Sequence, residues 1–102
     1  MSGIMELLQS YEEVIDVYEF VGEWEVWIGY QKVRIKVLKD KNGGYVSSTS
    51  HYYHGSQQAG PYISSINGGK TVEAAVREAM RQLLTFYRPD DENAKWVVND
   101  SY

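Results

Sequence analysis

The sequence has no cysteine and only two prolines. The missing cysteine excludes disulfide bonds, cysteine-based zinc fingers and thiol catalysis. No apolar run approaches the roughly 20 residues that cross a bilayer, and no basic region followed by an apolar run stands at the start of the sequence. We therefore expect a cytoplasmic protein with no signal peptide and no membrane association.

Length and composition predict one folded domain over residues 1–102. Hydrophobic residues make up 43% and charged residues 24% of the chain, and both values are close to globular averages. A chain of this length buries about two-thirds of the surface that it exposes when unfolded. We therefore expect a hydrophobic core that forms without disulfide bonds, metal ions or cofactors.

Positive charge is missing from the first third of the chain. Residues 1–31 contain seven acidic residues and no Lys or Arg, whereas residues 32–41 contain five basic residues and one acidic residue. The seven acids are Glu6, Glu12, Glu13, Asp16, Glu19, Glu23 and Glu25. Such segregation produces a strong local field, which bears on binding partners more than on the fold.

Apolar residues at steps of three and four predict a first helix over about residues 4–18. These residues are Ile4, Leu7, Leu8, Tyr11, Val14, Ile15 and Tyr18. The opposite face of this helix carries acidic residues, and Ser2 is a candidate N-cap. The pattern predicts that the apolar face packs on the core and the acidic face meets solvent.

Alternating apolar and polar residues over 23–38 predict a β-hairpin that turns at Tyr30-Gln31. The cross-strand pairs expected on the apolar face are Ile28 with Val33, Val26 with Ile35, and Trp24 with Val37. On the polar face, we expect Glu25 opposite Lys36 and Trp27 opposite Arg34, which would form an ion pair and a cation–π contact.

The rest of the chain predicts an α+β fold. Asn42-Gly43 signals a tight turn, so hairpins extend over about 23–53, and a further strand is expected over 62–66. A helix over about 72–87 begins after Thr71 and ends before Pro89. The inward face of this helix comprises Val72, Ala75, Val76, Ala79, Met80, Leu83 and Tyr87, and Gln82 is expected on the outward face. We expect an N-terminal helix, a three- to four-stranded antiparallel meander, this helix on one face of the sheet, and a short tail over 89–102 that docks on the sheet or adds an edge strand.

Chemistry-bearing residues are sparse. His51 and His54 lie three positions apart in a strand, where side chains alternate between faces, so they do not predict a metal site. Gly69-Lys70-Thr71 matches only the end of a phosphate-binding loop. The hydroxyl-rich run over 47–50 has no positioned base, because the side chain of His51 is expected to diverge from it. We expect no catalytic residues, no metal and no cofactor.

Four segments together carry a family resemblance. They are Val33–Val37, Asn42–Ser47, Gly69–Ala75 and Leu83–Tyr87. With these segments, residues 32–88 resemble the HicB-like antitoxin domain, in which two strands precede a helix that opens with Gly-x-Thr-hydrophobic-Glu-x-Ala. The resemblance implies a protein that masks a small basic ribonuclease. More distantly, the order helix, three strands, helix is similar to a double-stranded RNA-binding domain.

Two classes of function follow. The first is a non-enzymatic regulatory module, antitoxin-like or inhibitory, that presents an acidic and aromatic surface to a basic protein; its candidate contact residues are Glu12, Glu13, Asp16 and Glu19. The second is a nucleic-acid-binding accessory domain, which combines phosphate neutralisation with base stacking; its candidate residues are Lys32, Arg34, Lys36, Trp27 and Tyr30. The oligomeric state stays open and includes a homodimer.

Overall fold

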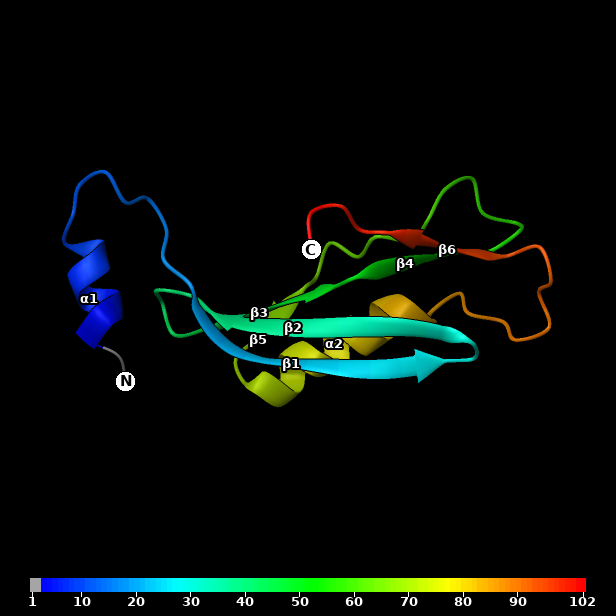
Figure 1. The fold of residues 1–102 in the computed structure, drawn as a ribbon, viewed down its shortest axis with the longest axis horizontal. Helices are drawn as coiled ribbons and strands as arrows, with labels where there is room; N and C mark the ends of the chain where they lie inside the picture. The colour runs from blue at the N-terminus through cyan, green and yellow to red at the C-terminus, as the bar shows by residue number, and fades with distance from the viewer. Residues whose placement is uncertain (1–2) are drawn as a thin grey trace.

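The protein is α+β, as the sequence predicts. A computed structural model describes residues 3–102 (Figure 1). In chain order, the elements are α1 (Gly3–Gln9), β1 (Glu19–Ile28), β2 (Gln31–Lys39), β3 (Tyr45–Thr49), β4 (His51–His54), β5 (Gly68–Gly69), α2 (Val72–Leu84) and β6 (Lys95–Val98). Neither helix within residues 3–102 has the length and apolar character that a membrane crossing requires.

The strands form two antiparallel sheets. The larger sheet has the order β1-β2-β3-β5, and the smaller one pairs β4 with β6. The last part of the expected hairpin region over 23–53 is divided at Ser50, so β3 and β4 pair with different neighbours. The tail supplies the edge strand β6, and it pairs in the smaller sheet. No strand forms over 62–66. Instead, β5 follows, where a side chain on Gly68 would lie 2.2 Å from the carbonyl oxygen of Tyr45.

The core lies between α2 and one face of the larger sheet. It includes Ile28, Val33, Ile35, Ala79 and Leu83, all buried. Thr71 caps α2, because its hydroxyl accepts a hydrogen bond from the backbone N–H of Ala74 at 3.0 Å. The helix ends at Leu84 rather than near residue 87, and Pro89 disfavours helical backbone just before it.

The expectation for Gln82 is wrong. Its side chain is buried, with 8% of its surface exposed. The amide Nε2 donates to Thr49 Oγ1 at 2.9 Å, and Oε1 accepts from the backbone N–H of Ser64 at 2.9 Å. Gln82 therefore joins α2 to β3 and to the loop before β5, and these two polar partners let an amide occupy an inward position.

The hairpin turns one residue earlier than expected. Gly29, with φ at 60°, and Tyr30 form the two-residue loop, because glycine suits the first central position of such a turn. The register therefore moves by two residues: Val26 pairs with Val33, Trp24 with Ile35, Glu25 with Arg34, Glu23 with Lys36, and Trp27 with Lys32. A shift of two keeps every side chain on its predicted face, although the expected pairs of Glu25 with Lys36 and of Trp27 with Arg34 do not form.

Burial along the edge strand β1 is weaker than the pattern predicts. Trp24 lies on the same face as the buried Ile35, yet it is 43% exposed, and Trp27 on the opposite face is 64% exposed. Trp24 packs along its own strand, where its ring lies against Gly22. Trp24 therefore lies on the predicted inward face of the sheet, but its side chain is only partly buried.

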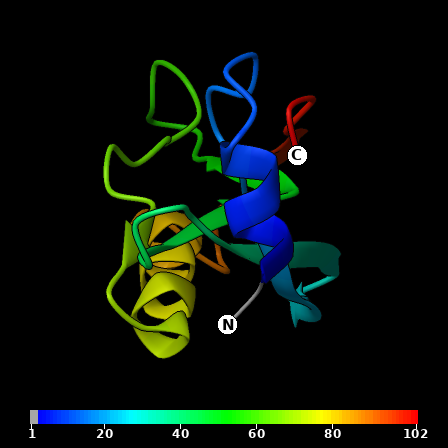
Figure 2. The same ribbon diagram turned by 90° about the vertical axis from the view of Figure 1, so that its left-hand side faces the viewer.

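The N-terminal helix is much shorter than predicted and stands apart from the core. α1 ends at Gln9, and none of its residues is buried. It projects from one end of a molecule whose extents are 51 × 24 × 19 Å (Figures 1 and 2). No sheet face packs on α1, and the apolar face predicted over 10–18 stays largely exposed, so it lacks the packing that would extend a helix. The buried residue of this segment is Val17, which lies off the predicted apolar face. The candidate cap Ser2 lies outside the described residues.

We expect Gln82→Ala to lower the free energy of unfolding by roughly 1–3 kcal/mol, because it leaves Thr49 and the backbone of Ser64 without their partner. Leu83→Ala, at a fully buried site, should cost roughly 2–5 kcal/mol. The exposed Arg77→Ala is the control and should change little. Urea titration of the three variants measures these costs, and equal midpoints for Gln82→Ala and Arg77→Ala would contradict the bridging role.

Candidate functional site

The acidic candidates do not share one helix face. Glu12 and Glu13 are exposed in the turn after α1. Asp16 lies in irregular chain, with its carboxylate 3.4 Å from the ammonium group of Lys41. Glu19 begins β1 and stands opposite Lys39. Basic residues of the same chain therefore face Asp16 and Glu19, whereas Glu12 and Glu13 have no ion-pair partner within residues 3–102.

The basic candidates lie together on the face of the sheet opposite α2, among acidic partners. The ammonium group of Lys32 is 3.9 Å from the Glu25 carboxylate, and Arg34 stands opposite Glu25 in the register. Lys36 donates to the main-chain carbonyl oxygen of Tyr102 at 2.9 Å and lies 4.3 Å from the centre of that ring. These contacts satisfy much of the positive charge within the chain itself.

Tyr102 covers part of this open face. Its hydroxyl donates to the carboxylate of Glu23. Burial raises the pKa of the Tyr102 hydroxyl, and the hydrogen bond to Glu23 and its negative charge raise it further. The hydroxyl therefore stays protonated and keeps donating at neutral pH. The aromatic candidates differ from the lysines, because Trp27 and Tyr30 are strongly exposed near the hairpin tip.

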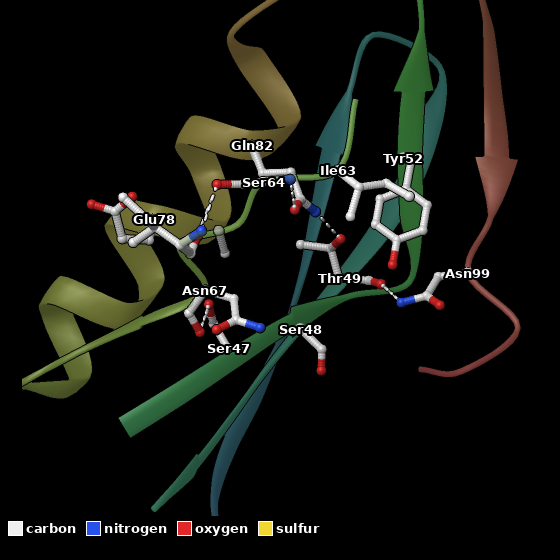
Figure 3. Close-up of a pocket in the computed structure, with 12 residues that line it drawn as sticks. Ser47, Ser48, Thr49, Tyr52, Ile63, Ser64, Asn67, Glu78, Gln82 and Asn99 are labelled. Carbon is white, nitrogen blue, oxygen red and sulfur yellow. Dashed lines mark hydrogen bonds between the residues drawn. The ribbon is translucent and has the colours of Figure 1, made fainter. Parts of the chain in front are cut away.

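A polar pocket of about 90 Å³ lies between α2, β3 and the loop before β5 (Figure 3). Its hydrogen bonds join the elements around it. Gln82 lies between Ser64 and Thr49, the hydroxyl of Ser47 donates to the carbonyl oxygen of Asn67 at 3.1 Å, and Asn99 Nδ2 donates to the carbonyl oxygen of Thr49 at 2.8 Å. The volume is far below the roughly 300–1,000 Å³ of ligand pockets. We assign this pocket a structural role.

Ser50 and His51 are closer than the sequence predicts. Ser50 Oγ lies 2.8 Å from His51 Nδ1, so their side chains do not diverge. Ser50 Oγ also accepts from the backbone N–H of Arg34, and Gln31 Nε2 lies 3.4 Å from His51 Nε2. If Gln31 donates, the imidazole carries its proton on Nδ1 and donates to Ser50. In that tautomer the histidine cannot act as a base for the serine.

The sequence analysis missed an aromatic groove at the end of the molecule opposite α1. It has a volume of about 380 Å³ and is formed by the hairpin loop and the segment that follows α2. Tyr30, Tyr53, Tyr87 and Trp96 are among its lining residues. The tyrosine-rich composition hints at such a surface, but no local pattern brings residues near 30 and near 90 together.

The chain matches no protein-family model, no curated protein and no solved structure in the three comparisons made.

We expect a modest loss of stability on mild acidification that depends on His51. Burial lowers the pKa of His51 from its ordinary value of 6.5. Because the unfolded chain then binds the proton more readily, stability is full above pH 6.5 and falls as the pH drops through the lowered value. Thermal unfolding at pH 7.5 and 5.5 should show a smaller difference for His51→Gln than for the unmodified protein. A matched His54→Gln control should keep the difference; an unchanged pH dependence in His51→Gln would refute the assignment.

Proposed function

We propose that this chain is a non-enzymatic protein-binding module, of the antitoxin or inhibitor kind, that docks its N-terminal arm on a basic partner protein. The N-terminal arm is residues 3–18, which precede the sheet. One observation carries the proposal: the arm exposes six large apolar side chains, and Val17 is the one buried residue within it. The following paragraphs give the support for it.

The arm is apolar where a solvated segment would be polar. Ile4 is 63% exposed, Leu7 52% and Ile15 82%, and Leu8, Tyr11 and Tyr18 are exposed as well. Single surface hydrophobics are normal, but six large exposed ones within a segment of 16 residues favour an interaction surface. A short amphipathic helix with an uncovered apolar face suits a groove on another protein.

The charge of the arm indicates the character of that groove. Glu6, Glu12 and Glu13 are exposed, and the arm contains no Lys or Arg. A partner groove with an apolar floor and a basic rim would complement both features. Charge of one sign steers association and raises on-rates, and salt weakens this effect. The resemblance to HicB-like antitoxins points to the same kind of partner, a small basic protein.

Nucleic-acid binding is the second candidate, and the exposed Trp27 and Tyr30 favour it. Bases stack on such rings in single-stranded complexes. Against it, Lys32 has Glu25 as a neighbour and Lys36 is held by Tyr102. The chain also carries a formal net charge of −4, which repels phosphate. Retention on an anion exchanger without retention on heparin would favour the protein-binding proposal.

We expect two arm variants to weaken partner binding in different ways. The protein would be immobilised, its partner recovered from an extract of the source organism and identified by mass spectrometry, and the binding of that partner measured. Glu12→Lys with Glu13→Lys should slow association about tenfold or more at low salt and less at high salt. Leu7→Ser with Leu8→Ser should weaken binding at both salt concentrations, because it removes apolar contacts.

Both double variants should fold, since the four side chains are exposed. Unchanged circular dichroism and melting temperature would verify this. Arg77→Ala with Gln57→Ala, on exposed positions outside the arm, is the matched control and should bind normally. If both arm variants captured the partner as well as the unmodified protein at low salt, the arm would not be the binding surface.

A further inference from the structure

The aromatic groove joins two parts of the chain that are distant in sequence. One wall is the hairpin loop from Ile28 to Gln31, and the other is formed by Tyr87–Pro89, Asp91, Ala94 and Trp96. Its volume of about 380 Å³ falls within the roughly 300–1,000 Å³ range of small-ligand and side-chain pockets. In Figure 1, the hairpin tip and the segment after α2 lie at the end of the molecule away from α1.

The aromatic rings of the groove are packed before any ligand arrives. Tyr53 is buried and lies edge-on to Tyr87 and to Trp96, with ring centres 5.3 and 5.1 Å away, while Tyr87 and Trp96 are 6.1 Å apart. The Tyr53 hydroxyl also contacts the backbone of Arg88, accepting from its N–H at 3.3 Å. This support fixes the two outer rings, so little side-chain entropy is lost on binding.

The groove offers hydrogen-bond donors that the chain does not use. Within residues 3–102, the Tyr87 hydroxyl and the Trp96 indole N–H have no hydrogen-bond partner, although both side chains are half-buried. Tyr30 adds a fully exposed phenol at the mouth. Polar tips on apolar rings can satisfy backbone carbonyl oxygens while the rings cover apolar surface.

The rim of the groove is acidic. Asp91 lines the groove, and Asp90 and Glu92 flank it in the sequence. The basic residues of this segment, 88–95, are Arg88 and Lys95. Arg88 Nε lies 3.6 Å from the carboxylate of Asp90, which offsets its charge. Asp91 accepts hydrogen bonds from the backbone N–H and hydroxyl of Ser56, both at 2.9 Å, and these bonds lower the pKa of Asp91. The rim therefore stays negative at neutral pH and suits a cationic group.

From this juxtaposition of fixed tyrosine and tryptophan rings, unused donors and an acidic rim, we infer that the groove binds a proline-rich peptide segment carrying a basic residue. A polyproline II segment has no internal hydrogen bonds, so its carbonyl oxygens are free to accept from Tyr87 and Trp96. Its rings pack on aromatic side chains, and its backbone is already ordered. A basic residue at one end of the segment would lie beside Asp91.

The acidic rim favours the proline-rich peptide over single-stranded nucleic acid, which also binds to exposed aromatic rings. Single-stranded nucleic acid would stack on the same rings, but binding sites for it pair those rings with a positive groove. Here the segment 88–95 carries three acids against two basic residues, and one of these, Arg88, is paired with Asp90. The inference concerns a site remote from the N-terminal arm, so it stands or falls separately from the proposed function.

The test uses the full chain labelled with ¹⁵N and a synthetic peptide of one arginine followed by nine prolines. Of the three tryptophans, only the indole N–H of Trp96 should shift in the NMR spectrum, and the signals of Trp24 and Trp27 should stay in place. Affinity in the micromolar to millimolar range is expected for one short segment. A peptide with alanine in place of every proline should bind at least about tenfold more weakly.

Variants assign the binding to the groove. Tyr87→Phe keeps the ring and removes one donor, so affinity should fall about twofold to tenfold. Tyr30→Ala changes an exposed side chain that lines the groove, and Glu92→Lys changes an exposed side chain next to Asp91 in the sequence. Both should weaken binding without affecting the melting temperature. Trp27→Ala, an exposed ring on the other face of β1, is the matched control and should leave affinity unchanged.

Three results would overturn the inference. The first is the absence of a Trp96 shift with millimolar peptide. The second is equal binding of the proline and alanine peptides, or equal loss with Trp27→Ala and Tyr30→Ala. The third is a Trp96 shift with a ten-residue oligothymidylate at concentrations where the proline peptide gives none, which would assign the groove to nucleic acid.

Discussion

The packing of α2 on one face of the larger sheet is the constraint on which the rest of the structure depends. The thirteen residues of α2 span about 20 Å, whereas the ten residues of β1 span about 33 Å. Leu83 and Ala79 therefore pack in one cluster with the buried Val33 and Ile35, but the helix leaves the start of the edge strand uncovered. The core is compact and small, and large apolar side chains remain outside it.

The opposite face of the sheet is stabilised by charge instead of by a second helix. Glutamates of β1 stand opposite the basic residues of β2, and Tyr102 lies across Lys36 and Glu23. Exposed pairs of this kind contribute little free energy each, yet opposite charges in cross-strand positions favour one register. The charge segregation seen in the sequence is thus partly an internal match between two neighbouring strands. Of the seven acids within residues 3–31, only Glu6, Glu12 and Glu13 lack such a match.

Local sequence patterns predicted most of the helices and strands. Contacts between residues distant in sequence determine the features that these patterns did not predict. Alternation placed Val33 and Ile35 in the core correctly, even though Gly29 moved the turn, because a two-residue shift preserves faces. Helical periodicity overestimated α1, since a pattern of apolar residues does not say whether any surface is available to cover them. Helical periodicity also predicted wrongly that Gln82 faces outward, because the hydrogen-bond partners of Gln82, Thr49 and Ser64, are distant in sequence. The aromatic groove was not predicted for the same reason, because the residues that line it are distant in sequence.

The two surfaces that we propose for binding share one physical origin. A single helix cannot cover the whole sheet. Apolar surface therefore stays outside the core at both ends of the molecule, on the arm at one end and in the aromatic groove at the other. Both surfaces lie beside acids, Glu12 and Glu13 at the arm and Asp91 at the groove, and so both would favour the basic partners that we propose. Because they lie at opposite ends of a molecule 51 Å long, one partner can engage both only if its own sites are similarly far apart. Where that spacing matches, the second contact becomes intramolecular and strengthens binding without any new residue. Among partners that carry both a basic groove for the arm and a proline-rich segment for the aromatic groove, the molecule would then bind most tightly those whose two sites are spaced to match its length.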